Sequence, residues 1–460
     1  MESTAISPRP FPLWVTFVLL LAAPVLVFWR PGQPFFYILD DWRILQQVVE
    51  LPFWQYLTVP NTEHWYPLTN LICYGLFKLF GDHYSLLVLV NCLLTGVNAF
   101  LLYLFYRFHL SPSLALALSL FYAIAGVHPA AVWNSSYICF ILALGLFMGA
   151  LLLMQLYLQT PSSSRLFGVG LCGLLAVLSN NFVIVALAAL PFYPLFLGER
   201  EAKRRFWALA LVVVLCYLAF IIGYSRFAGV RSATTLNYNL FSLPGPAYLL
   251  HLAYGAVLSP FFYLFWGYYH FPVWAYVAAV ATLALSVALV WWGGAARERR
   301  LALWILFLSV LPMLLVSLIR YQKAPEQAFV PRYASYTLIG ALLFVGIAWN
   351  ILSRWLPARP WARILLPLGF LAILVYGQLG SLHSWREKYL EYSRNARDFY
   401  QEAGTGKAGT LFPPGDKRRD FLPWDCRNLT RAQALDIRRF LQGDLKRMRG
   451  AVLPPETGGR

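Results

Sequence analysis

Residues 84–106 read YSLLVLVNCLLTGVNAFLLYLFY, a run of 23 residues without an aspartate, glutamate, lysine or arginine. A helix needs about 20 apolar residues to cross the hydrocarbon core of a bilayer, so this run is long enough. The whole chain agrees, with 59% hydrophobic, 17% aromatic and 12% charged residues and a mean hydropathy of +0.59. These values predict an all-α polytopic membrane protein and exclude a soluble domain.

Other apolar stretches are of the same kind, and the sequence predicts about eleven transmembrane helices. The predicted spans are 13–29, 84–106, 112–127, 137–158, 166–179, 182–197, 206–224, 273–292, 301–319, 336–352 and 364–382. The first is expected to stay in place as a span. The segment MESTAISPRP lacks a basic run, and no small-residue cleavage site follows Trp29.

Basic residues near the span ends predict the orientation. With the N-terminus inside, the following groups all fall on the cytoplasmic side: Arg107, Arg165, Arg200-Lys203-Arg204-Arg205, Arg297-Arg299-Arg300 and Arg354-Arg359-Arg363. This holds only if 247–271 does not cross, and its proline, glycines and histidines favour an interfacial or re-entrant element. Large outer loops at 30–83 and 225–271, and a shorter one at 320–335, then place any chemistry on the extracytoplasmic side.

Acidic residues are scarce, yet two stand side by side. Up to residue 382 they are Glu2, Asp40, Asp41, Glu50, Glu63, Asp82, Glu199, Glu201, Glu298 and Glu326, most of which read as solvated loop charges. A carboxylate beside hydrocarbon is costly, so the pair Asp40-Asp41 predicts a functional site. The alternative is that one of them, Asp41 above all, caps the following helix DWRILQQVVE.

The chain changes character after residue 382. Residues 1–382 form the predicted transmembrane domain, and residues 383–460 form a basic tail with 16 lysines and arginines against 10 acids. Apolar residues recur at helical spacing in two stretches of this tail. We expect a small extracytoplasmic cap that contacts anionic headgroups, with docking of an acceptor as the alternative.

Several short segments follow one another in a characteristic order. They are YILDDW, HWYPLTNLICYGLFKLFGDHYSLLVLVNCLLTGVNAFLLYLFYR, GVHPAAVWNSSYI, LSNN and PRYASYTLIG. In this order they resemble the GT-C class of multispanning glycosyltransferases over about residues 10–395. The likeness is greatest to the protein O-mannosyltransferase and transmembrane-TPR mannosyltransferase branch, and more distant to the aminoarabinose transferases that modify lipid A. It implies inverting transfer of a sugar from a polyprenyl-phosphate carrier to an acceptor at the outer leaflet.

The resemblance also implies roles for residues. Asp40 and Asp41 match the acidic pair of the first outer loop, of which the first is usually catalytic. His64, Trp65 and Tyr66 lie where the family has a Tyr-Arg-Pro-Leu-like stretch, with Tyr66 in place of the arginine. The remaining matches are His128-Pro129 and Trp133 in the second outer loop and Arg332-Tyr333 before a late span. The departures are Ala130 and Ala131, which replace an acid and a histidine, and Asn180-Asn181, which replace a Lys-Glu pair.

The chemical requirements of sugar transfer also lead to Asp40 and Asp41. Sugar transfer to a hydroxyl needs a base near the acceptor oxygen and a cation to hold the departing phosphate. Among the outer acids Asp40 is the first choice for the base and Asp41 the second, ahead of Glu63 and Asp82. The outer cations are Arg30, Arg43, Lys78, Arg226, Arg231, Arg320, Lys323 and Arg332.

Arg332 is the first choice for the phosphate, because it follows Pro331 at the start of a span and its planar fork suits two phosphate oxygens. Lys323 and Arg320 come next. The alternative for Arg332 is an arginine that merely extends to the membrane interface.

Substrate contacts are expected from His64, Trp65, Tyr66, His128, Trp133 and Tyr333. The alternative is that the histidines are structural donors, which is the commoner role of a lone histidine, and that the aromatic residues belong to interfacial belts, as most such residues do. The six cysteines lack metal-type spacing. A divalent ion among Asp40, Asp41 and His128 is an open alternative, and we assign no metal site. The expected partners are the lipid-linked sugar, a protein, lipid or glycan acceptor and membrane lipids, with no nucleic acid.

Other classes fit less well. A secondary transporter would carry charges within its spans and a channel would carry rings of polar residues, and the predicted spans show neither. Two alternatives stay open, namely another cell-envelope glycan enzyme such as a polymerase or ligase, and a non-catalytic membrane assembly factor. The sequence therefore predicts a glycosyltransferase of the plasma (inner) membrane with an extracytoplasmic active site.

Overall fold

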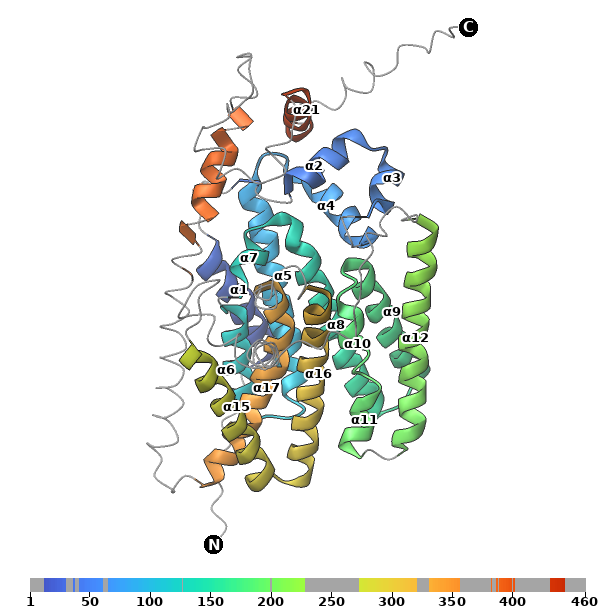
Figure 1. Cartoon of the computed structure of the whole chain (residues 1–460), viewed down its shortest axis with the longest axis vertical. Helices are drawn as coiled ribbons and strands as arrows, with labels where there is room; N and C mark the ends of the chain where they lie inside the picture. Colours follow the sequence, from blue (N-terminus) through green and yellow to red (C-terminus); the bar gives the residue numbers. More distant parts are fainter. Residues whose placement is uncertain are drawn as a thin grey trace.

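The structure is a computed structural model. It describes residues 12–29, 36–37, 41–60, 65–125, 127–198, 201–227, 273–320, 331–355, 382, 386–387, 389–398, 400–401 and 431–442. Within these ranges the chain forms helices, turns and loops without a strand, so the all-α prediction is confirmed (Figure 1). Four helices are long and apolar enough to cross a membrane by length and composition: Tyr84–Tyr106, Ser135–Gln159, Ala202–Phe227 and Ser335–Trp355. The count of eleven spans stays a prediction.

The bundle consists of α1 (Leu13–Phe28), α5 (Tyr84–Tyr106), α6 (Pro112–Ala123), α8 (Ile138–Gln159), α9 (Ser163–Ser179), α10 (Val183–Leu187), α11 (Phe192–Leu197), α12 (Ala202–Phe227), α15 (Val273–Gly293), α16 (Ala296–Arg320) and α17 (Pro331–Trp355). The predicted span 182–197 is thus two helices separated by a turn. Pro191 is the last residue of this turn and Pro194 lies within α11, and a proline removes a helical hydrogen bond at its position.

Shorter helices gather at one end of the bundle, at the top of Figure 1. Those at the top of the picture are α2 (Asp41–Glu50), α3 (Phe53–Thr58), α4 (Pro67–Phe80) and α21 (Arg431–Leu441). The 3₁₀ helix η1 (Ser135–Tyr137) contacts α2, and α7 (Pro129–Val132) contacts η1. We call this the loop end. It lies opposite the end of α11, the start of α12 and the turn that joins α15 to α16 (Figure 1).

Arginines near the starts of α9, α12 and α16 contact backbone at that opposite end. Arg165 and Arg205 each donate from Nη1 to a carbonyl in the last turn of α8, at Leu156 and Leu158, over 2.8 Å. Gly198, after α11, lies against the guanidinium of Arg300. The structure therefore brings members of the predicted cytoplasmic groups together, and the side of the membrane that they face stays a prediction.

Exposed tryptophans lie at or near the ends of several helices. Trp14 begins α1, Trp207 lies in the first turns of α12, Trp291 and Trp292 end α15 and Trp355 ends α17, and all are exposed. Tryptophan favours the headgroup region, because its ring is apolar and its N–H is polar. Together with the four long apolar helices, this is typical of an integral membrane protein.

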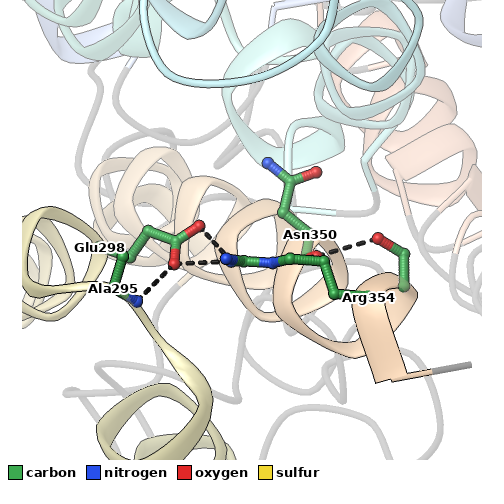
Figure 2. Close-up of polar contacts among 5 residues, drawn as sticks. Ala295, Glu298, Asn350 and Arg354 are labelled. Atoms are coloured by element: carbon green, nitrogen blue, oxygen red, sulfur yellow. Dashed lines mark hydrogen bonds and ion pairs between the residues drawn. The ribbon is translucent and has the colours of Figure 1, made fainter. Parts of the chain in front are cut away.

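Glu298 joins the start of α16 to the end of α17 (Figure 2). Arg354 Nη2 donates to both carboxylate oxygens at 2.5 and 2.6 Å, and the backbone N–H of Ala295 donates to Oε2 at 2.8 Å. A glutamate that reaches back to the N–H just before its own helix is half of a capping box. Glu298 is therefore a structural residue and not a solvated loop charge.

Helices α1 and α5 approach each other at Gly96. A Cβ at this position would lie 2.7 Å from Leu20 O and from Leu21 Cα, which are backbone atoms that cannot rotate away. Gly96→Ala should therefore lower the free energy of unfolding by about 1–3 kcal/mol, the usual effect of overpacking. The melting temperature of the purified protein in detergent measures the change.

Gly75 in α4 is the matched control, since it is exposed and a Cβ there meets nothing within 4 Å. Gly75→Ala should leave stability unchanged or raise it by about 0.5–1 kcal/mol, because alanine favours a helix over glycine. Equal melting temperatures for Gly96→Ala and the wild type would contradict the close approach of α1 and α5.

Candidate functional site

Asp41, the first residue of α2, is fully buried. Its Oδ1 accepts from Ser135 Oγ at 2.8 Å and from the backbone N–H of Ser136 at 2.7 Å, and Tyr84 Oη lies 3.0 Å from Oδ2 as a donor. These partners belong to η1 and to the first residue of α5. Asp41 therefore joins the first predicted outer loop to the second one, which contains His128 and Trp133. Its role is thus larger than the capping of α2.

Helix α5 holds the second loop in place through a polar stripe on one face. Asn91 Nδ2 donates to the carbonyls of Ala131 and Val132 at 3.4 and 3.2 Å, and Asn98 Nδ2 donates to Ile141 O at 2.8 Å. Residues seven apart fall on the same side of a helix. Because these donors satisfy buried carbonyls of α7 and α8, they fix the backbone that surrounds Asp41.

Trp133 is buried between α1 and the tail. Its Nε1 donates to Phe28 O at 2.9 Å, and its ring lies 6.3 Å from Phe28 and 5.7 Å from Tyr389 between ring centroids. Only 2% of the residue is exposed. In this structure Trp133 packs against protein, and its part in sugar binding stays a prediction.

His128 is buried in the loop before α7. Its Nε2 lies 2.7 Å from Tyr122 O, and a carbonyl can only accept, so Nε2 carries the hydrogen. Burial lowers the pKa of His128 to about 4, although the bond to Tyr122 opposes the shift. The imidazole is therefore neutral at neutral pH, with Nδ1 as an acceptor.

Trp65 is packed against the last turns of α12. Its ring centroid lies 5.8 Å from Phe220 and 6.3 Å from Phe227, and its Nε1 donates to Thr58 O at 3.1 Å. Gly223 leaves room for this ring, because a Cβ there would lie 2.5 Å from it. Trp65 thus anchors the start of the YPLT segment, in which Tyr66 precedes α4 and is partly exposed.

The remaining segments of the sequence pattern also meet at this end. Thr69 Oγ1 of YPLT donates to Ser179 O of LSNN at 2.8 Å. Asn180 Oδ1 accepts from the backbone N–H of Phe182 at 3.0 Å, and the Phe182 ring lies 5.2 Å from Tyr336 of the PRYASY segment. Segments far apart in sequence are therefore neighbours in the fold.

The described part of the tail covers the loop end. Tyr400 lies 5.1 Å from Phe36 between ring centroids, and Gln433 Nε2 donates to Glu50 Oε1 at 2.7 Å. Ile437 and Phe440 of α21 are buried, and α21 lies above α2 in Figure 1. This part of the tail therefore packs on the first loop as well as facing solvent. Its location on the extracytoplasmic side of the membrane remains a prediction.

Several predicted site residues fall outside this description. Asp40, His64 and Lys323 lie outside the described residues. Arg320 ends α16, while Arg332 and Tyr333 lie in the first turn of α17. Within the described ranges no three His, Cys, Asp or Glu residues gather as metal ligands would. The phosphate site at Arg320, Lys323 and Arg332 therefore remains a prediction from the sequence.

Sequence reasoning missed Tyr84, Asn134, Ser135 and Ser136, which surround Asp41. A signal was present, because Asn and Ser clusters after an apolar segment form turns and helix caps. What the pattern could not supply was the partner of that turn, since Asp41 and Ser135 are 94 residues apart.

No protein-family model matches the chain, and no curated protein matches it. Several solved structures are similar to it, among them two of one protein. A crystal structure of ArnT from Cupriavidus metallidurans in the apo state is 16% identical, covers 97% of this chain and 82% of its own, and has a TM-score of 0.44. The same protein bound to undecaprenyl phosphate is 15% identical, covers 96% and 81%, and has a TM-score of 0.46. At these TM-scores the likeness does not assign an activity to this chain.

Proposed function

We propose that the chain is a GT-C-type glycosyltransferase that moves a sugar, with inversion, from a polyprenyl-phosphate carrier to an acceptor hydroxyl at the outer face of the membrane. One observation carries the proposal. The short segments on which the sequence resemblance rests are distant along the chain, and parts of them meet at the loop end, where Asp41 binds Ser135 and Ser136, Thr69 binds Ser179 and Phe182 packs on Tyr336. Segments that contribute residues to one site must lie close together in the fold. Loop segments with unrelated roles would have no such requirement.

The proposed chemistry starts with Asp40, which removes the proton from the acceptor hydroxyl as the sugar leaves phosphate. Asp41 is the second carboxylate of the pair, and its bonds to Ser135 and Ser136 position the loop that carries both acids. Buried donors around a carboxylate hold it without reorganisation during the reaction. The base would thereby be placed by the fold itself.

The departing polyprenyl phosphate is assigned to Arg332, with Lys323 and Arg320 in support. Arg320 and Arg332 flank the segment between α16 and α17. A guanidinium binds two phosphate oxygens at once, which suits a leaving group that gains negative charge. His64, Trp65, Tyr66, His128, Trp133 and Tyr333 are assigned to the substrate side of the site, where the buried members shape it.

A non-catalytic assembly factor is the second candidate. The observation that favours it is the engagement of Asp41 in purely structural bonds, together with Asn180 in place of a charged residue. Such a factor would keep the fold of the loop end and bind lipid without turning it over.

The test is a transfer assay in liposomes with polyprenyl-phosphate sugars and a mixture of protein, lipid and glycan acceptors. We expect acceptor-dependent release of polyprenyl phosphate, and mass spectrometry of the purified protein should identify a bound polyprenyl lipid. Lipid binding without release for any sugar would favour the assembly factor. Absence of both would overturn the proposal.

A further inference from the structure

Phe36 and Tyr37 come shortly before the acid pair in the sequence, and both are buried. Tyr37 Oη donates to the carbonyl of Gly81, in the turn between α4 and α5. The Tyr37 ring lies 4.7 Å between centroids from the ring of Tyr84, whose hydroxyl is 3.0 Å from Asp41 Oδ2. The chain is therefore fastened to the start of α5 just before it reaches the acids.

Trp42 fastens the chain on the other side of the acid pair. Its indole Nε1 donates to Tyr37 O at 2.9 Å, and the residue is fully buried. This bond closes residues 37–42 into a short loop that contains Asp40 and Asp41. Consecutive Cα atoms lie about 3.8 Å apart, so a residue between two fixed neighbours has a small range of positions. Tyr37 and Trp42, the two anchor residues, therefore limit where the acid pair can lie.

The described part of the tail encloses this loop from outside. The Tyr400 ring lies 5.1 Å from the ring of Phe36 between centroids. Leu441, the last residue of α21, lies with its carbonyl against Gly81 and leaves no room for a Cβ there. Both anchor residues are fully buried among these neighbours, so they do not touch a substrate. Any effect that they have on the reaction must act through the acids.

Two other buried residues make bonds of the same kind away from the acid pair. Trp304 is fully buried, and its Nε1 donates to Ala189 O at 3.0 Å. Tyr106 is also fully buried, and its Oη donates to Ile339 O at 2.6 Å. Both bonds lie within the bundle, and neither closes a loop that carries an acid. They provide a measure of what such a bond contributes to packing alone.

We propose that Tyr37 and Trp42 are positioning residues, which hold the acid pair in place against the second loop. This inference rests on the proposed function and adds to it the residues that place the base. Misplacing a reacting group by about 1 Å slows a reaction by up to about a hundredfold. A change at either anchor residue removes no contact to the donor lipid, so it should lower kcat and leave KM for that lipid unchanged.

The test removes one hydrogen bond at each anchor residue and keeps an aromatic ring. Trp42→Phe loses the bond to Tyr37 O, and Tyr37→Phe loses the bond to Gly81 O. We expect kcat for acceptor-dependent release of polyprenyl phosphate to fall about tenfold to a hundredfold, with KM for the donor lipid within about twofold of the wild type. Hydrogen exchange of the α2 amides should become faster, a readout that needs no turnover.

Trp304→Phe and Tyr106→Phe are the matched controls, because each makes the same chemical change at a fully buried site. They should lower the melting temperature by a similar amount and leave kcat and the exchange of α2 as in the wild type. A kcat for Trp42→Phe and Tyr37→Phe equal to that of the controls would overturn the inference, as would wild-type exchange of α2. Absence of transfer by the wild-type protein would instead refute the proposed function, and the positioning role with it.

Discussion

Asp40→Asn should lower acceptor-dependent sugar transfer by about two to four orders of magnitude, the usual contribution of a general base. Asparagine keeps the shape of the side chain and most of its hydrogen bonds, but it cannot take a proton. Folding and donor binding should therefore be largely retained. The assay follows release of polyprenyl phosphate from liposomes at saturating donor.

Asp41→Asn is the matched variant for Asp40→Asn, and the structure makes it a clean one. An amide oxygen can accept from Ser135 Oγ and Ser136 N as Asp41 Oδ1 does. The new amide nitrogen can donate to Tyr84 Oη, whose own hydrogen can go to Trp133 O, 2.9 Å away. Only the charge is lost, so the loss of turnover should be smaller than for Asp40→Asn.

Full activity in Asp40→Asn would remove Asp40 from the proposed mechanism. If Asp41→Asn then lost transfer with an unchanged melting temperature, the role of base would pass to Asp41. If both variants were fully active, Glu63 and Glu326 would be the next acids to test. The double variant distinguishes shared roles, since two carboxylates that act as one unit give losses that do not add.

Asp41→Ala should have the largest effect on stability, with the free energy of unfolding lowered by about 3 kcal/mol or more. The change removes three hydrogen bonds to a buried carboxylate, and hydrogen bonds to charged groups contribute about 1.5–3 kcal/mol each. Ser135 Oγ loses its acceptor, whereas Tyr84 Oη keeps its bond to Trp133 O and Ser136 N keeps its bond to Asn134 Oδ1. The measurement is the midpoint of thermal unfolding in detergent. Limited proteolysis reports whether residues 133–136 open.

The control for this effect is again Asp41→Asn, which should stay within about 1 kcal/mol of the wild type because its hydrogen bonds can be kept. A melting temperature for Asp41→Ala equal to that of Asp41→Asn would mean that Asp41 does not fasten the two loops. The same pair of variants therefore measures the structural part of Asp41 separately from any part in catalysis.

Much of the helical framework follows from local sequence. Runs such as 84–106 and 138–159 are apolar over a membrane-spanning length, so their helices are predictable without tertiary contacts. The helix at Asp41 was likewise expected, because an acid before an apolar-periodic run begins a helix. The break between α10 and α11 was missed, since hydropathy alone does not weigh the prolines that interrupt a run.

The candidate site depended less on local pattern. The sequence favoured Asp40 and Asp41 over the other acids, because the chain has few carboxylates on the predicted outer side. It did not predict that Trp65, His128 and Trp133 would be buried and bonded to backbone carbonyls. It also did not predict that Tyr389 would pack on Trp133, because the tail read as a separate solvated cap.

The sequence by itself determined the class of the protein, the apolar helices, the scarcity of acids and the order of the motif segments, because each is a property of composition or of neighbours along the chain. Only the tertiary structure decided that Asp41 is bound by Ser135 and Ser136, that Tyr37 is bound to Gly81 and that α21 covers α2. These contacts join residues that are tens to hundreds of positions apart. Their geometry depends on how the helices pack, and no local pattern encodes it.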